Sequence, residues 1–248
     1  MLKLAPDTCN PFGALDSGMF TGAFSRRAFG NMSLSYGDTN GAVNNRRNFL
    51  NSLGIDYKDL VCAKQAHGNN VMYAKDEHKG RGALAYETSI PDTDGFITDF
   101  KNLPLAIFTA DCLSVFLYDP ARPAIGLVHS GWRGLRENIV LNAVELMRSN
   151  FNTKPSELFA GFGPCIKGCC YEVSAEFKDY FPGELVERRG RLFLDLGEAN
   201  KKRLTALGVK DENIFSSCPC TFCDNENLFS FRREGKACAR TLSVIMLK

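Results

Sequence analysis

The segment TADCLSVFLYDPARPAIGLVHSGWRG, residues 109–134, carries the clearest fold signal in this chain. Two apolar runs, Ser114–Tyr118 and Ala124–Val128, flank the loop DPARP, whose aspartate and prolines are typical of a hairpin connection. Antiparallel pairing of the two runs would bring their outer ends together. Cys112 lies just before the first run and His129 just after the second, so we expect these side chains to be neighbours.

Outside this hairpin, short apolar runs alternate with helical periodicities. We expect further strands at Gly95–Thr98, Leu105–Phe108, Leu158–Phe162, Arg191–Asp195 and Thr241–Ile245. We expect helices at about Val43–Leu53, close behind Trp132-Arg133 with Ile139 to Met147 on its apolar face, at Val173–Phe181 and at Asn200–Leu207. The pattern predicts an α/β or α+β sandwich of mixed sheets flanked by helices, in a single domain spanning residues 1–248.

Composition excludes some functions and favours others. Hydrophobic residues make up 44% of the 248 residues and charged residues 23%, and the formal net charge is only +2. Because Lys and Arg are scattered, we expect no nucleic-acid partner and no membrane association. The chain start lacks a signal-peptide pattern, so we expect a cytoplasmic protein. Ten cysteines in such a chain indicate free thiols, metal ligation or catalysis rather than disulfides.

Reactive residue types gather in the hairpin segment and in Gln65-Ala-His67-Gly68. His67, Cys112 and His129 are the donor types of a catalytic zinc site, which keeps one position open for water or substrate. The same residues could form a hydrolase in which Cys112 is the nucleophile and His129 its base. Asp111 would then orient a histidine or the substrate, and Gln65 would stabilise an oxyanion. These residues by themselves leave both hypotheses open.

Copper is a third alternative for the same donors. A multicopper oxidase needs several histidine-rich centres, and three histidines in the whole chain are too few for them. Binding of a single copper ion in vitro remains compatible with a cysteine and two imidazoles.

Arginine is the residue type best suited to gripping phosphate or carboxylate. The candidates are Arg26, Arg46, Arg133, Arg232 and Arg233. Arg133 stands out, because it follows His129 closely and precedes an expected helix start, whose free N–H groups attract anions. We predict substrate or phosphate binding by Arg46, Arg133 and the loop residue Asn31.

A second cysteine-rich segment, Cys218-Pro-Cys-Thr-Phe-Cys223, resembles half of a zinc ribbon. No Cys-x-x-Cys pair follows at ribbon spacing, so Cys169-Cys170 and Cys238 would have to supply the other ligands. We therefore expect structural thiols here rather than a second zinc ion.

Several motifs along the chain resemble those of the YfiH-like family, also known as the laccase-domain or polyphenol-oxidase family. They are Lys64-Gln-Ala-His-Gly68, Asp94-Gly-Phe-Ile-Thr98, Thr109-Ala-Asp-Cys112, His129-Ser-Gly-Trp-Arg-Gly134, Gly163-Pro-Cys-Ile166, Cys170-Tyr-Glu-Val173 and Phe229-Ser-Phe-Arg-Arg233. The resemblance implies an α/β sandwich related to cytotoxic-necrotizing-factor hydrolases.

The same resemblance implies a zinc-dependent purine nucleoside phosphorylase that converts adenosine, inosine, guanosine or methylthioadenosine and phosphate into free base and ribose 1-phosphate, with adenosine deaminase activity. It assigns zinc to His67, Cys112 and His129, and so favours ligation over nucleophilic attack by Cys112. Some members are linked instead to editing of peptidoglycan precursors, so a cysteine amidase is the alternative, and a copper-dependent polyphenol oxidase is a second one. No oligomeric state is implied.

Overall fold

The predicted hairpin forms the centre of a six-stranded mixed sheet in the computed structural model, which describes residues 8–13 and 18–248. Its two strands pair along their whole length, which confirms the prediction. In order across the sheet, the strands are β13 (Ile214–Phe215), β9 (Phe159–Phe162), β7 (Leu113–Asp119), β8 (Ala124–Ser130), β5 (Gly95–Thr98) and β4 (Val71–Tyr73). The outermost pair at each edge is parallel and the inner pairs are antiparallel.

A second mixed sheet joins the two ends of the chain. Its order is β1 (Thr8–Cys9), β2 (Phe20–Ser25), β14 (Thr241–Leu247), β6 (Leu105–Thr109) and β3 (Val61–Cys62). The early strand β2 pairs with the last strand, β14, so the sheet cannot be completed before the whole chain is present.

The two sheets pack face to face, as side-chain alternation on β7 illustrates. Phe116 and Tyr118 point into a buried cluster shared with Leu105 and Ile245 of the other sheet. Residues one position along a strand face the opposite side, and Val115 on β7 accordingly packs against the helices instead.

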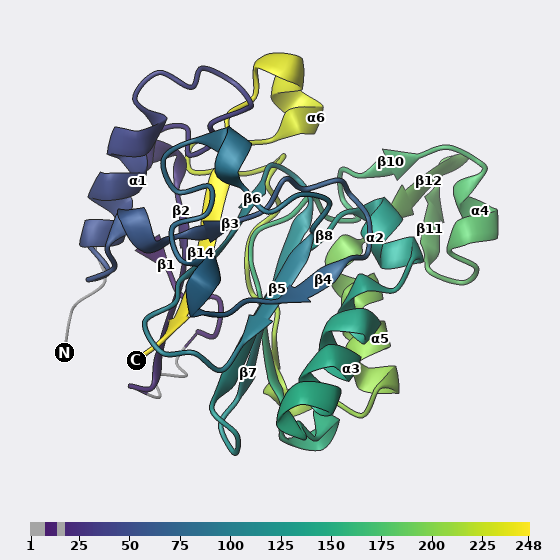
Figure 1. The fold of residues 1–248 in the computed structure, drawn as a ribbon. Helices are drawn as coiled ribbons and strands as arrows, with labels where there is room; N and C mark the ends of the chain where they lie inside the picture. The colour runs from purple at the N-terminus through teal and green to yellow at the C-terminus, as the bar shows by residue number, and fades with distance from the viewer. Residues whose placement is uncertain (1–7, 14–17) are drawn as a thin grey trace.

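Helices cover both outer faces of the sandwich (Figure 1). The long helices are α1 (Ala42–Asn51) on the five-stranded sheet, and α3 (Ile139–Phe151) and α5 (Leu196–Ala206) on the six-stranded sheet. Short helices are α2 (Trp132–Arg136), α4 (Phe177–Tyr180) and α6 (Phe231–Glu234). The third sheet has the order β10 (Glu172–Val173), β12 (Arg191–Leu194) and β11 (Leu185–Arg188). The predicted mixed-sheet α/β sandwich is confirmed.

Two helix predictions need correction. The helix expected directly behind Trp132-Arg133 is split, because Asn138 adopts a left-handed conformation (φ 58°) between α2 and α3. Asparagine tolerates this conformation, which a continuous helix cannot accommodate. The helix expected at Val173–Phe181 is mostly absent: Val173 pairs with Leu192 in the small sheet, and only four residues form α4.

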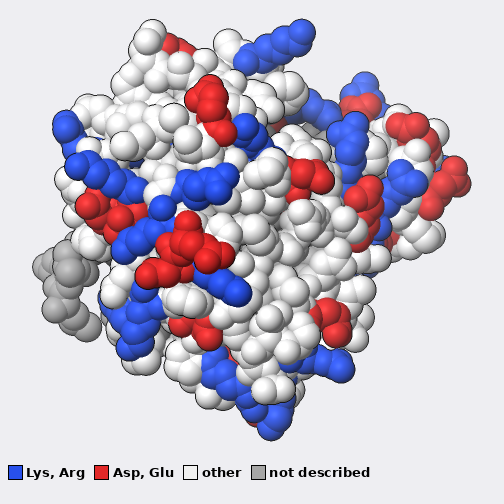
Figure 2. All heavy atoms as spheres, in the orientation of Figure 1, with Lys and Arg blue, Asp and Glu red and all other residues white. Residues whose placement is uncertain are grey.

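The surface carries no concentration of one charge on the face seen in Figure 2, where blue and red side chains are interspersed. Among residues 8–13 and 18–248, no helix is long and apolar enough to cross a membrane.

Candidate metal centre and cavity

Strand register brings Cys112 beside His129, as predicted. Ser114 pairs with His129, so Cys112 lies two residues beyond that pair on the same side of β7. His129 falls inside β8 rather than after it, on the face that Ile125 and Leu127 turn toward the second sheet. Both side chains therefore lie at the end of the sandwich, between the two sheets.

His67 lies on the loop that follows β3, a strand of the other sheet, and its side chain reaches the same place. Its ring lies 4.8 Å from that of His129, centroid to centroid, at an interplanar angle of 80°. The metal-ligating atoms of His67, Cys112 and His129 all lie within 4.8 Å of one another. His67 has φ 62°, a left-handed conformation that is uncommon for residues other than glycine and that clusters at functional sites.

Asp94 holds both histidines. One carboxylate oxygen, Oδ1, lies 2.8 Å from Nδ1 of His129 and accepts the backbone N–H of His67 at 3.0 Å. The other, Oδ2, accepts the N–H groups of Ala66 and Gly68 at 3.0 and 2.8 Å. A histidine whose Nδ1 bonds a carboxylate presents Nε2 for ligation, the usual arrangement in zinc sites.

Sequence reasoning missed Asp94, although it begins a motif shared with the family. The signal was an aspartate directly before β5, the strand that pairs with β8 and so lies beside His129. Its backbone also binds there, because the carbonyl of Asp94 accepts the N–H of His129 at 2.7 Å.

Electrostatics favour a thiolate at Cys112. Burial alone would raise the pKa of this thiol, but the charge and hydrogen bond of His129, with a hydrogen bond from His67, outweigh it and lower the pKa to about 6. Burial would lower the pKa of His129, but Cys112 and Asp94 outweigh it and raise the pKa to about 9. A thiolate is the form that both a metal and a nucleophilic mechanism require.

The donor set and its surroundings fit a zinc ion. Two imidazoles and a thiolate supply three ligands and leave one coordination position open. Gly131 makes room for them, because a Cβ there would lie 2.9 Å from the Cys112 sulfur and 3.6 Å from the His67 ring. The three side chains therefore converge on a space that the backbone keeps clear.

A cavity of about 420 Å³ opens over this cluster. Its size suits a small organic ligand. Aromatic side chains form much of its wall: Tyr36, Tyr86, Phe108, Trp132, Tyr171 and Phe231. Its cationic residues are Arg46, Arg133, Arg232 and Arg240. Arg240 was not among the sequence candidates; its guanidinium lies 4.5 Å from the ring centre of Tyr36.

Asp111 and Gln65 line the cavity but are bonded within the protein. The Asp111 carboxylate accepts the Thr221 hydroxyl at 2.6 Å and the Arg232 N–H at 2.7 Å. The Gln65 amide donates to the Phe108 carbonyl at 2.9 Å and accepts the Phe108 N–H at 2.8 Å. These bonds make both residues part of the cavity frame, and their direct action on substrate stays a prediction.

The three predicted substrate-binding residues occupy different settings. Arg46 lines the cavity but is only 2% exposed. Its guanidinium donates to the carbonyls of Met32, Gly82 and Ala83 and so ties helix α1 to two other chain segments. Arg133 is exposed at the rim, with its guanidinium 4.4 Å from the centre of the Trp132 ring.

Asn31 lies behind the rim. Its side chain donates to the carbonyls of Tyr36 and Asp38, both at 2.7 Å, and accepts the Arg240 N–H at 2.9 Å. It thereby shapes the loop of residues 33–36, which faces the cavity. Of Arg46, Arg133 and Asn31, Arg133 is therefore the best placed to bind an anion.

The fold and the cluster define an α/β sandwich protein with three side chains at one end, His67, Cys112 and His129, that could hold a metal ion. The family described as "multi-copper polyphenol oxidoreductase laccase" matches residues 16–248, and the chain belongs to this family.

Its relatives carry two enzyme names. The chain is 33% identical to "Purine nucleoside phosphorylase YlmD" of Geobacillus stearothermophilus, over 95% of this chain and 91% of that protein. It is 30% identical to "Adenosine deaminase RL5" of an unknown prokaryotic organism, over 79% of this chain and 78% of that protein. The crystal structure of Bacillus licheniformis YfiH superposes with a TM-score of 0.91 at 30% identity, covering 98% of this chain and 97% of that one.

Proposed function

We propose that this protein is a zinc-dependent purine nucleoside phosphorylase that also deaminates adenosine. The observation that carries the proposal is the convergence of His67, Cys112 and His129 at the base of a cavity with aromatic and arginine walls. The enzyme names of its relatives support the choice of substrate class.

The cavity walls match the two parts of the substrate. Aromatic faces such as Trp132 and Tyr36 offer stacking surfaces for a purine ring, which has a π-face of its own. Arg133, with Arg232 nearby on the wall, offers positive charge to phosphate. We assign phosphate neutralisation to Arg133, because the guanidinium of Arg46 already donates to three carbonyls.

A zinc ion on His67, Cys112 and His129 would supply a Lewis acid with one open position. Asp94 keeps His129 oriented for it and holds the His67 loop in place. The protein's own share of catalysis is then to place phosphate against the anomeric carbon of the nucleoside and to exclude competing water. Phosphorolysis transfers the ribosyl group from the base to phosphate and releases the free base. Deamination adds the oxygen of water to the ring carbon that carries the amino group and releases that group as ammonia.

The test measures zinc content and phosphate-dependent release of adenine from adenosine. We expect Cys112→Ala and His67→Ala to lose bound zinc and at least 100-fold in kcat/KM. The matched control is His78→Ala, since His78 is a half-buried histidine outside the cavity, bonded to Lys75. A chelated, metal-free enzyme that kept full activity would contradict the proposal.

A cysteine amidase acting on peptidoglycan precursors is the competing function. One observation favours it: Asp94, His129 and Cys112 stand in series, as in a triad of acid, base and nucleophile. A covalent adduct on Cys112, formed with an electrophilic amide analogue in zinc-loaded protein, would support the amidase. Oxidation of phenols that needs added copper would indicate copper chemistry instead.

A further inference from the structure

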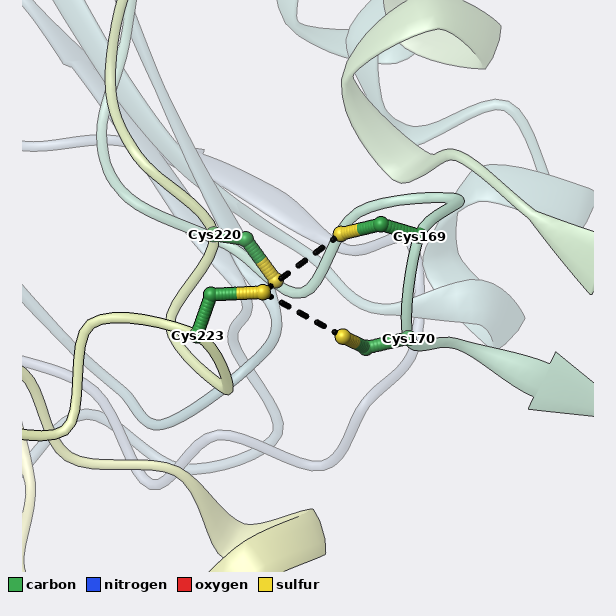
Figure 3. Close-up of side chains that lie close together, drawn as sticks. All are labelled: Cys169, Cys170, Cys220 and Cys223. Atoms are coloured by element: carbon green, nitrogen blue, oxygen red, sulfur yellow. Dashed lines mark hydrogen bonds between the residues drawn. The ribbon is translucent and has the colours of Figure 1, made fainter.

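Four cysteine sulfurs converge at a second place (Figure 3), and none of these cysteines lines the cavity. The four-cysteine cluster consists of Cys169, Cys170, Cys220 and Cys223. Two chain segments about fifty residues apart supply it: the turn before β10, and the loop between β13 and α6. Their sulfur atoms all lie within 4.8 Å of one another.

The spacing of these sulfurs is that of a metal site. The sulfur of Cys223 lies 3.8 Å from that of Cys169 and 3.4 Å from that of Cys170. A tetrahedral zinc ion with Zn–S bonds of about 2.3 Å separates its ligand sulfurs by about 3.8 Å. Disulfide sulfurs are only about 2.05 Å apart, and all four cysteines are free thiols.

Backbone hydrogen bonds already hold the two segments in register. The Thr221 N–H donates to the Cys165 carbonyl at 3.0 Å, and Cys165 and Cys220 form a parallel bridge. The Cys170 N–H donates to the Lys167 carbonyl at 2.9 Å, which closes the turn. The Lys167 N–H lies 3.5 Å from the Cys220 sulfur, and such N–H donors stabilise metal-bound thiolates.

We propose that the four-cysteine cluster binds a structural zinc ion in a closed four-thiolate site. Four soft sulfur donors at tetrahedral spacing select zinc among the hard and soft divalent ions, and four protein ligands leave no position for substrate. This proposal differs from the expectation, drawn from the sequence, that the cysteines of this segment are structural thiols without a metal ion. The other two candidates lie elsewhere, since the Cys218 sulfur donates to the Phe162 carbonyl and the Cys238 sulfur to the Ala239 carbonyl.

The site would clamp one wall of the cavity. Thr221, next to Cys220, donates its hydroxyl to Asp111, which precedes Cys112. Tyr171, next to Cys170, lines the cavity. Loss of the second ion should therefore loosen substrate binding while leaving His67, Cys112 and His129 in place.

The first experiment counts zinc by mass spectrometry in full-length protein produced with ample zinc. We expect two ions per chain in the wild type, one in Cys220→Ser and one in His67→Ala. The matched control is Cys218→Ser, a neighbouring thiol outside the cluster, which should keep two ions. One ion in the wild type that His67→Ala alone removes would overturn the proposal. Iron in place of zinc would overturn the choice of metal.

A second measurement needs no variant. Titrating the wild type with a mercurial reagent should release the second zinc ion as four thiols react, and replacement by Co²⁺ should give the thiolate-to-cobalt charge-transfer bands of a four-sulfur site. A titration showing two thiols missing and no zinc would reveal a disulfide, which would also overturn the proposal. The KM of Cys220→Ser should rise several-fold while its kcat changes less, whatever the substrate proves to be.

Discussion

Asp94 is the residue that holds the two histidines of the candidate metal centre in place. Its two carboxylate oxygens accept three successive backbone N–H groups around His67 and also bind the ring of His129. It is 1% exposed, so water cannot replace these bonds. One carboxylate thus fixes a ligand from each of the two sheets.

Replacing Asp94 by Asn should weaken metal binding. An amide has a single accepting oxygen, so it cannot accept all of these N–H donors. We expect the zinc affinity to fall 10- to 100-fold, the usual cost of losing an outer-shell carboxylate, and kcat/KM to fall with it. Competition with a chromophoric chelator measures the affinity.

Asp119→Asn is the matched control for this prediction. Asp119 is also buried and accepts the N–H groups of Ala121 and Arg122, but at the far end of the hairpin. Its substitution should leave zinc affinity unchanged. Equal affinities in Asp94→Asn and the wild type would show that Asp94 does not orient the ligands.

At the residue scale, the sequence predicted contacts between side chains that a single hairpin brings together. Cys112 and His129 followed from the hairpin, whereas the approach of His67 depends on packing between two sheets, which no local pattern encodes. Arg46 shows the opposite limit. The sequence favours its charge as a ligand for phosphate, but in the structure the buried guanidinium donates to three backbone carbonyls.

At the scale of elements, the turn from β8 into α2 sets the space around the metal centre. Gly131 occupies it with φ −75°, a conformation open to any residue, so only space demands glycine there. The same turn starts the short helix that places Trp132 and Arg133 on the cavity wall.

Gly131→Ala should therefore impair metal binding more than folding. The new Cβ would lie 2.9 Å from the Cys112 sulfur, closer than such contacts allow. We expect zinc affinity to fall by roughly tenfold or more, with little change in the melting temperature. Zinc competition and thermal unfolding measured on one sample would check both.

Gly126→Ala, in the strand β8 that precedes this turn, serves as the comparison. Its Cβ would press at 3.3 Å on the Leu117 side chain in the core, far from the ligands. This variant should lower the melting temperature and keep zinc affinity. The reverse pattern in the two glycine variants would refute the assigned role of Gly131.

Element prediction succeeded where apolar alternation was strong. The strands at Gly95–Thr98 and in the hairpin are found as expected, because both are buried in the sheet centre. The helix expected through Val173–Phe181 was wrong because spacing of apolar residues at three and four positions also suits a short strand followed by one helical turn. The spacing of apolar residues gave no sign of the break between α2 and α3 at Asn138.

At the scale of the whole molecule, the beginning and the end of the chain are joined beside the cavity. Arg27 follows β2, and its side chain pairs with Glu234 of α6 and donates to the Leu228 carbonyl. Glu234 also accepts from Arg233 at 2.7 Å. Burial alone would raise the pKa of Glu234, but hydrogen bonds from Arg27 and Arg233 outweigh it and hold the pKa below its usual range.

Glu234→Gln should destabilise the protein in a pH-dependent way. A lowered folded-state pKa stabilises the fold above the unfolded-state pKa of about 4.3, and this contribution is lost as pH falls through the folded-state pKa. For this partly exposed cluster we expect about 1 kcal/mol at pH 7, or about 2–4 °C in melting temperature.

Thermal unfolding across pH checks this expectation. The difference between Glu234→Gln and the wild type should shrink as pH is lowered below about 4. Glu226→Gln, at an exposed position of the same segment, should melt like the wild type throughout. The same difference in melting temperature at every pH would mean that ionisation of Glu234 does not stabilise the contact between Arg27 and α6.

The sandwich itself was predictable from alternating strands and helices, but the pairing of β2 with β14 was not, and the sequence named Cys169 and Cys170 as possible partners of the Cys218–Cys223 segment without showing that they meet. Both unite segments distant in sequence, and only the packed molecule determines which segments meet. The residues alone left open whether Cys112 is a metal ligand or a nucleophile. The resemblance to a known family favours the ligand.

The placement of the cavity at the end of the sandwich separates two kinds of evolutionary change. The candidate ligands Cys112 and His129 lie at the end of the buried hairpin, where substitutions are costly, while rim residues such as Tyr36 and Phe231 are about half exposed, at 47% and 48%. Rim loops can therefore diverge without disturbing the ligands.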